Sequence, residues 1–226
     1  MPRYLSWIFG VLIAGLLVGG PWTFLHYQYH QARHFRVVRA GVLYRSGQMS
    51  LAGLKRAVHD YGIKTVVTLR DAYFYGEPPP DLEEEDYCRA EGIAYCRITP
   101  RAWWRPDGTA PADKGVRKFL EVMDDPESFP VLIHCFAGIH RTGAFCAVYR
   151  MEYQHWSNAE AIEEMKACGY SNLDDELDLL GYVEHYRPRW RVQAQADPLP
   201  TTVSDKPVAL PVKRTRHKAK PAAPAE

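Results

Sequence analysis

Cys135 and Arg141 stand six positions apart in the segment HCFAGIHRTG, and together they can hold and attack a tetrahedral oxyanion. The apolar, β-branched run 131–133 precedes this segment and a helix-compatible stretch begins near Thr142, so a strand, a tight loop and a helix N-terminus are predicted in succession. Backbone N–H groups curling between Cys135 and Arg141 would form a nest for an anion, to which the helix dipole adds positive potential. The same field favours a thiolate, because the pKa of a cysteine in this setting falls from about 8.5 to roughly 3.5–7.5. The planar guanidinium of Arg141 matches two oxygens of the anion.

The other residues of the segment complete the predicted anion site. Gly138 permits a positive φ where a side chain would clash, and the hydroxyl of Thr142 can donate a hydrogen bond to the sulfur. His140 either adds positive charge to the pocket or is an exposed histidine without a role. Cys135 and Arg141 are therefore candidate catalytic residues, and the candidate phosphate-binding residues are Phe136, Ala137, Gly138, Ile139, His140, Arg141 and Thr142.

At these residues the segment resembles the signature loop of the cysteine-dependent protein tyrosine and dual-specificity phosphatases. The resemblance implies hydrolysis of a phosphomonoester in two steps through a phosphocysteine intermediate, with no metal and no cofactor. Its competitors are a phosphate-binding pseudophosphatase and a sulfur enzyme of the rhodanese or arsenate-reductase type. The Thr-Gly pair after Arg141 and the late position of the loop in the chain disfavour the sulfur enzyme.

The resemblance also implies an aspartate that protonates the leaving group from a loop before the signature strand. The segment WWRPDGTAP, 103–111, lies in the expected region, and Asp107 follows Pro106 there. The match is partial, since Arg105 separates Trp104 from Pro106. Asp107 is the candidate acid, and Asp113 is the alternative.

Three stretches narrow the resemblance to the compact atypical dual-specificity phosphatases of bacteria, plants and fungi. They are FRVVRAGVLYRSGQ (35–48), the signature loop, and DDELDLLGYVEHY (174–186). Members of that group act on phosphoproteins or on inositol phosphates and pyrophosphates. The interior of the loop here holds no lysine, which favours phosphotyrosine or a small phosphoester over an inositol phosphate or pyrophosphate.

Alternating strand and helix patterns surround the loop and predict an α/β fold with a central, largely parallel sheet flanked by helices. A hairpin is expected over 35–48, and strands over 63–69, 93–98 and 131–133. Ser50 and Asp81 are expected to cap helices, and Ser157 with Glu160 forms a capping-box pattern. The last amphipathic helix ends at Pro188, so the phosphatase-like domain is predicted to span 31–190.

The first 30 residues form a separate predicted unit. No Asp, Glu, Lys or Arg occurs over 4–32, and the apolar run 5–25 has the length of a bilayer crossing. A cleaved signal peptide is the competing interpretation, but Pro21 makes the following site a poor one for cleavage. We therefore expect a single-pass membrane protein with an anchor over 1–30. Arginines after the run place the catalytic domain in the cytoplasm by the positive-inside rule, without fixing the side firmly.

The remaining sequence excludes several classes of protein. Residues 191–226 contain six Pro and seven Ala without apolar periodicity, which predicts a disordered tail. The net charge of the chain is +1, and the body before this tail is mildly acidic, so a nucleic-acid-binding domain is not indicated. Five cysteines without a CxxC pair indicate neither a disulfide framework nor a zinc site.

Overall fold

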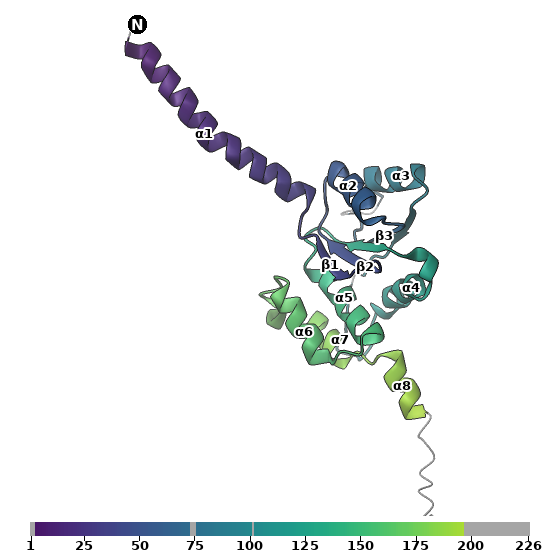
Figure 1. Ribbon diagram of the computed structural model, residues 1–226. Helices are drawn as coiled ribbons and strands as arrows, with labels where there is room; N and C mark the ends of the chain where they lie inside the picture. The colour runs from purple at the N-terminus through teal and green to yellow at the C-terminus, as the bar shows by residue number, and fades with distance from the viewer. Residues whose placement is uncertain (1–2, 73–75, 101, 197–226) are drawn as a thin grey trace, which may run out of the picture.

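The strands form one five-stranded sheet in the order β1-β2-β5-β3-β4. The computed structural model describes residues 3–72, 76–100 and 102–196 (Figure 1). The first two strands pair antiparallel, and every other pairing is parallel, which confirms the predicted α/β fold with a largely parallel sheet. The strands are β1 (Arg36–Arg39), β2 (Leu43–Ser46), β3 (Thr65–Thr68), β4 (Ala94–Arg97) and β5 (Val131–His134).

Helices cover both faces of the sheet (Figure 1). Two of them lie on one face, α2 (Leu51–Tyr61) and α3 (Leu82–Ala90). On the opposite side lie α4 (Asp113–Asp124) and α5 (His140–Tyr153), and α5 contacts the sheet. The helices α6 (Asn158–Ala167) and α7 (Leu177–His185) pack against α5. Two short 3₁₀ turns, Pro126–Ser128 and Leu173–Asp175, connect these elements.

The central strand β5 is buried because its side chains alternate between two apolar layers. Leu132 packs with Leu54 of α2 and Cys88 of α3. Val131 and Ile133 pack in the layer of α4 and α5. A strand that is covered on both faces reads as a continuous apolar run, which is the pattern seen over 131–133.

Several local predictions are confirmed. The hairpin turns at Gly41, whose φ is +72°, and joins β1 to β2. The Ser50 side chain accepts a hydrogen bond from the backbone of Gly53, and Ser157 with Glu160 forms both halves of a capping box.

The expected cap at Asp81 is wrong. Asp81 occupies the position before α3 but makes no capping hydrogen bond with its side chain. Its carboxylate accepts instead from the hydroxyls of Thr68 and Tyr95 and from Arg97. Hydroxyl and guanidinium donors on β3 and β4 thus replace the helix N–H groups as partners of this carboxylate.

Ordered structure continues past the predicted end of the domain. The helix α8 (Arg189–Ala196) occupies the first residues of the stretch expected to be disordered. Arg189 bonds the carboxylates of Glu152 and Asp124, and the indole N–H of Trp190 donates to the carbonyl of Met151 at 2.8 Å. These contacts join α8 to α5 and to the end of α4. They are made by polar groups, so the spacing of apolar residues in the sequence does not predict them.

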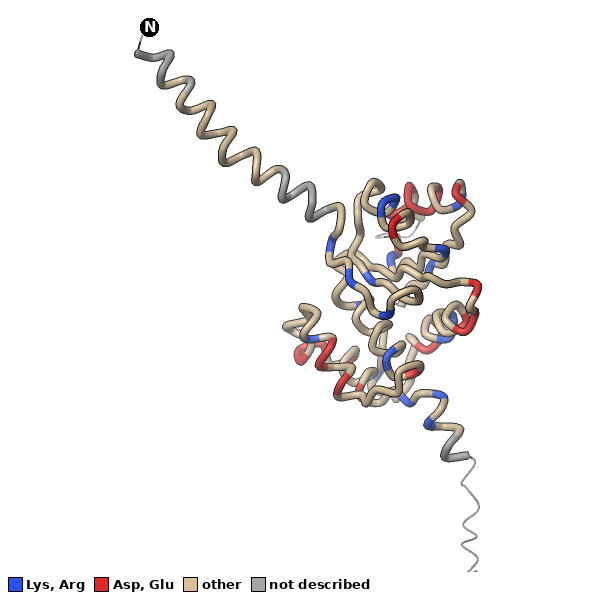
Figure 2. Tube along the Cα trace, in the orientation of Figure 1, with Lys and Arg blue, Asp and Glu red and all other residues tan. Residues whose placement is uncertain are grey.

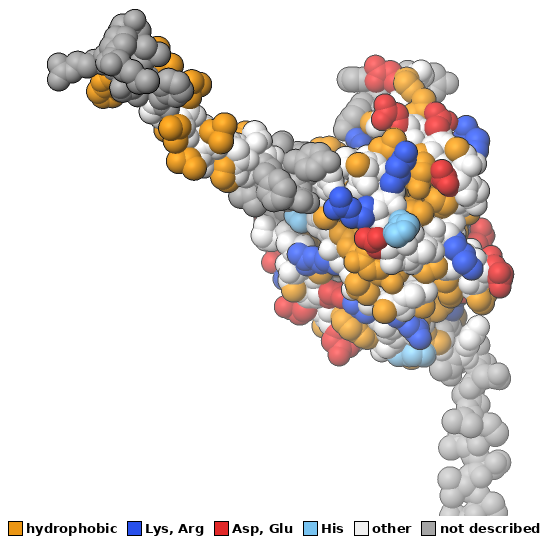
Figure 3. Space-filling view, turned by 45° about the horizontal axis from the view of Figure 1, so that its top comes forward, with side chains coloured by type: hydrophobic (Ala, Val, Ile, Leu, Met, Phe, Trp, Pro, Cys, Tyr) orange, Lys and Arg blue, Asp and Glu red, His pale blue; other side chains and the backbone are white. Residues whose placement is uncertain are grey.

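The N-terminal helix α1 (Arg3–Gln31) extends away from the sheet, with exposed apolar side chains along it (Figures 1 and 3). Among the residues that the structure describes, no helix offers an apolar stretch of the length that a bilayer crossing requires. This finding overturns the predicted single-pass anchor over 1–30, and with it the membrane location and the membrane partner.

Candidate functional site

The signature loop lies at the carboxyl edge of the parallel strands. His134 at the end of β5 pairs with Ser46 of β2 on one side and with Thr68 of β3 on the other. Cys135 follows directly, and α5 begins at His140, two residues earlier than predicted. The loop therefore runs straight from the most central strand into a buried helix, at the edge where α/β proteins bind ligands.

Cys135 is buried at the bottom of this loop, with only 4% of its surface exposed. The backbone N–H of Gly138 donates to its Sγ at 3.2 Å. Burial by itself would raise the pKa of the thiol, but the hydroxyl and N–H of Thr142, the N–H of Gly138 and the charge of His134 together hold the pKa below its ordinary value of 9.0. Gly138 adopts the positive φ that the sequence predicted, +75°.

Donors outside the loop form hydrogen bonds to its carbonyl oxygens. The buried Arg45 donates through Nη2 to the carbonyl of Gly138 at 2.8 Å, and the N–H of Gln48 donates to that of Phe136 at 3.0 Å. Nδ1 of His34 lies 2.7 Å from the carbonyl of Ala137. In a trans peptide the N–H points opposite to the carbonyl, so these contacts turn the next three N–H groups toward the interior of the loop. An anion nest results.

Arg45, Gln48 and His34 were missed by the sequence analysis as parts of the site. All three belong to the chain around the β1–β2 hairpin, about 100 residues before the loop (103 for His34 and Ala137, 93 for Arg45 and Gly138). The available signal was the segment FRVVRAGVLYRSGQ, which carries Arg45 and Gln48 and contributes to the family resemblance.

Arg141 lies in the first turn of α5, half-buried, and its Nη1 donates to the carbonyl of Leu69 just after β3. This contact fixes the guanidinium at the same sheet edge as the nest. The loop that carries Cys135 and Arg141 is therefore tied to β2 through Arg45 and to the end of β3 through Leu69.

The remaining predicted loop residues line the outside of the nest or support it. Phe136 is 51% exposed, with the guanidinium carbons of Arg33 and Arg70 at 4.3 and 5.2 Å from its ring centroid. His140 stacks on Tyr170 at 4.4 Å. The loop also contains Ile139, which packs against the core, and the fully buried Thr142.

Asp107, the candidate acid, lies on an exposed turn. Its Oδ1 accepts from the N–H and the hydroxyl of Thr109 at 2.9 and 2.6 Å. These two bonds hold the pKa of its carboxyl below the ordinary value, and the bond from the hydroxyl has the larger effect. The alternative, Asp113, accepts a hydrogen bond from the hydroxyl of Tyr182 at 3.0 Å. The role of Asp107 thus stays a prediction.

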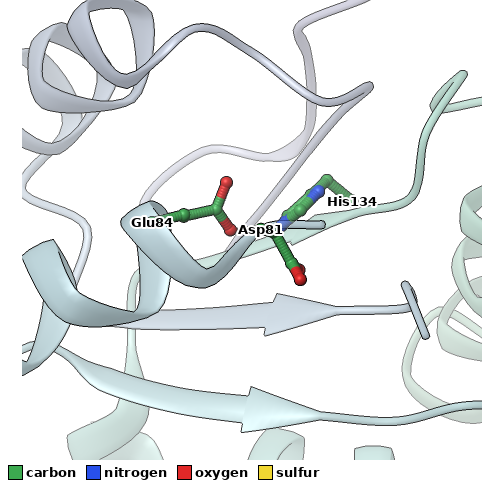
Figure 4. Close-up of side chains that lie close together, drawn as sticks. All are labelled: Asp81, Glu84 and His134. Atoms are coloured by element: carbon green, nitrogen blue, oxygen red, sulfur yellow. Dashed lines mark hydrogen bonds and ion pairs between the residues drawn. The ribbon is translucent and has the colours of Figure 1, made fainter. Parts of the chain in front are cut away.

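One group of side chains has the composition of a metal site. Ligand-type atoms of Asp81, Glu84 and His134 lie within 4.8 Å of one another (Figure 4). The atoms are already engaged, because Asp81 accepts from Arg97 at 2.6 Å and Glu84 contacts the His134 ring at 2.6 Å. The bond from Arg97 and the contact between Glu84 and His134 thus occupy the atoms that would have to bind a metal ion.

Comparison with known proteins agrees with this geometry. The family described as "DSP-PTPase phosphatase fused to NAD+ Kinase" matches residues 31–178, more than half of the chain. The chain belongs to this phosphatase family.

A curated relative and two solved structures add detail to the family assignment. The dual specificity protein phosphatase TpbA from Pseudomonas aeruginosa is 46% identical over 54 residues, which are 24% of this chain and a quarter (25%) of TpbA. The crystal structure of TpbA matches with a TM-score of 0.50 at 26% identity, over 69% of this chain and 86% of that one. The core catalytic domain of the PP-IP phosphatase SIW14 from S. cerevisiae matches with a TM-score of 0.55 at 22% identity, over 75% and 96% of the two chains. At that identity SIW14 shows a shared fold.

Proposed function

We propose that the chain hydrolyses phosphomonoesters through a phosphocysteine intermediate, with Cys135 as nucleophile and Arg141 as the clamp on the phosphoryl oxygens. One observation carries this proposal: the buried thiol of Cys135, with its lowered pKa, lies inside a loop whose carbonyls of Phe136, Ala137 and Gly138 are turned outward. A thiolate and a nest of N–H donors thus share one pocket, which is the arrangement that attack on a phosphate requires.

The reaction proceeds in two displacements. The Cys135 thiolate attacks phosphorus while the bond from phosphorus to the ester oxygen breaks, and Asp107 donates a proton to the departing oxygen. Water then attacks the phosphocysteine, giving its proton to the Asp107 carboxylate, and the S–P bond breaks to release inorganic phosphate and the thiolate. Loop N–H groups and Arg141 hold the non-transferring oxygens through both steps.

For the substrate we propose phosphotyrosine, presented by a protein or as a small phosphoester. A crystal structure of TpbA has been determined in complex with phosphotyrosine, at 25% identity and a TM-score of 0.50. The half-exposed ring of Phe136 offers an aromatic surface beside the nest, and the loop interior 136–140 contains no lysine. An inositol phosphate or pyrophosphate remains the alternative, since Arg33 and Arg70 flank Phe136 and supply positive charge for further phosphates.

The test is hydrolysis of p-nitrophenyl phosphate by the full chain in EDTA and reductant. We expect turnover that Cys135→Ser abolishes while inorganic phosphate still binds, because a hydroxyl is a far weaker nucleophile than a thiolate at neutral pH. Cys168→Ser, at a half-buried cysteine after α6, is the matched control and should retain activity.

Two outcomes would oppose the proposal. Turnover by Cys135→Ser at the rate of the unaltered chain would remove the cysteine from the mechanism. A folded, reduced chain that binds phosphate without turnover would be a pseudophosphatase. A panel of phosphotyrosine peptides and inositol phosphates then decides between the two substrate classes.

A further inference from the structure

A buried charge cluster lies directly behind the nucleophile, outside the residues that touch substrate in the proposed reaction. Three of its members are Asp81 and Glu84 at the start of α3 and His134 at the end of β5 (Figure 4). The fourth is Arg97 at the end of β4, which bonds Asp81. The first turn of α3 is strongly acidic, as Figure 2 shows. Glu84 alone of its three consecutive glutamates is buried, whereas Glu83 is exposed.

Both carboxylates of the cluster accept hydrogen bonds from neighbouring side chains. Asp81 accepts from Thr68, Tyr95 and Arg97 at 2.6, 2.9 and 2.6 Å. Burial works against ionisation, but the bonds from Thr68, Arg97 and Tyr95 hold the pKa of Asp81 below its ordinary value. Tyr95 also donates to Glu84 at 3.2 Å.

The contacts of Glu84 bear on the state of His134. The Arg97 guanidinium bonds Asp81 at 2.6 Å and Glu85 at 2.9 Å, so the basic side chain in contact with the buried Glu84 carboxylate is His134. A buried carboxylate without a cationic partner is costly, which favours a protonated imidazole here. Nε2 of His134 lies 2.6 Å from Oε1 of Glu84. Burial alone would lower the pKa of His134, but Glu84, Asp81 and Cys135 raise it.

We propose that Glu84 is a positioning residue for the nucleophile: it holds His134 as an imidazolium beside Cys135, and this cation sustains the thiolate. The proposal rests on the function proposed above for Cys135. Glu84 touches neither the sulfur nor the nest and acts through the neighbouring histidine.

A second path from Glu84 reaches the same loop. Its Oε2 accepts from Nε2 of Gln48 at 2.8 Å, and the backbone N–H of Gln48 donates to the carbonyl of Phe136. The side chain of Gln48 also accepts from Arg70. Glu84 thus fixes both the charge behind Cys135 and one of the contacts that turn the loop carbonyls outward.

Other groups face the same two side chains and define what the test must separate. Around His134 they are Thr68 of β3, Tyr95 and Arg97 of β4, and Asp81. Around Cys135 they are Thr142 of α5 and Tyr170 after α6. His134 both contacts Glu84 and adjoins the cysteine, and Gln48 bonds both Glu84 and the loop, so the test must separate these two routes.

The experiment measures the rate of Cys135 alkylation by iodoacetamide against pH in the full chain, with mass spectrometry of the peptide that carries Cys135. Other buried thiols interfere little, because burial raises the pKa of Cys88 to about 12 and of Cys146 to about 11. Glu84→Gln keeps the shape of the side chain and removes its charge. We expect the midpoint of alkylation to move upward by about one pH unit or more, while the exposed control Glu83→Gln leaves it unchanged.

A double variant shows whether His134 transmits the effect. In a His134→Asn background, Glu84→Gln should shift the midpoint much less, because the cation is gone and only the contact through Gln48 remains. An equal shift with and without His134 would overturn the proposal, and so would a folded Glu84→Gln protein whose alkylation midpoint is unchanged.

If Glu84→Gln does not fold, NMR titration of the His134 ring in the unaltered chain provides the test. We expect the ring to stay protonated at pH 7, and a neutral ring at that pH would overturn the proposal. Neither measurement requires turnover, so a failure of the proposed phosphatase activity would be seen separately with p-nitrophenyl phosphate.

Discussion

A Cβ atom on Gly138 would lie 2.3 Å from the backbone nitrogen of Gly47 and 2.5 Å from the carbonyl carbon of Ser46. The signature loop and the end of β2 are therefore in contact backbone to backbone. At the same position φ is +75°, which L-residues with a side chain rarely adopt. Two independent constraints thus require glycine at residue 138.

Gly138→Ala should destabilise the protein by about 2 kcal/mol or more, because it adds the cost of a left-handed conformation to that of the clash. Activity on p-nitrophenyl phosphate should fall with it, since the loop can no longer present its N–H to Cys135. Gly108→Ala is the matched control, because Gly108 has a φ of +82° but no atom within 4 Å of the added Cβ. Urea unfolding of both variants separates strain from clash, and equal losses would show that the contact with Gly47 is unimportant.

Arg45→Met removes the donor to the Gly138 carbonyl and keeps the apolar stem. Since that carbonyl bond is buried, we expect a loss of stability of about 1–3 kcal/mol. We also expect inorganic phosphate to inhibit about tenfold more weakly, which corresponds to a loss of about 1.4 kcal/mol of binding free energy. Arg36→Met, on the exposed residue that pairs with Arg45 in the hairpin, is the control. Unchanged phosphate inhibition in Arg45→Met would show that the loop keeps its shape without this bond.

The proposed acid is tested by replacing each candidate carboxyl. Asp107→Asn should slow hydrolysis of aryl phosphates with poor leaving groups by about 10²–10⁴ and affect good leaving groups much less. Asp113→Asn should leave this leaving-group dependence as it is in the unaltered chain, since its carboxylate bonds Tyr182. The reverse pattern, with Asp113→Asn sensitive and Asp107→Asn normal, would assign the acid to Asp113.

The contacts of α8 predict a change of stability with pH. The hydrogen bond from Arg189 is the main cause that holds the pKa of Asp124 below 3.8. A carboxyl with a lowered folded pKa stabilises the fold above pH 3.8, and this contribution disappears as the pH falls through the folded value. Arg189→Ala should therefore lower the free energy of unfolding at pH 7 and reduce its acid dependence. The exposed neighbour Arg187→Ala should do neither, and identical pH profiles for Arg189→Ala and the unaltered chain would contradict the prediction.

The sequence determined the parts of this protein that depend on neighbours along the chain. The apolar run 131–133 predicts a strand because it is buried on both faces of the sheet. Local backbone geometry around the loop likewise predicts Cys135 as the nucleophile and a turn at Gly138. The hairpin at Gly41 and the capping box at Ser157 follow for the same reason, since their hydrogen bonds close within a few residues.

Only the tertiary structure decided which distant side chains support the site. Arg45 meets Gly138, and Glu84 meets His134, because the sheet order sets β2 and β3 on either side of β5 and α3 over its end. The carboxylate of Asp81 likewise turns from the helix it precedes toward Arg97. Such pairs are separated by tens of residues in the chain. Their hydrogen bonds depend on how distant elements pack together, which the spacing of apolar residues within one helix or strand does not specify.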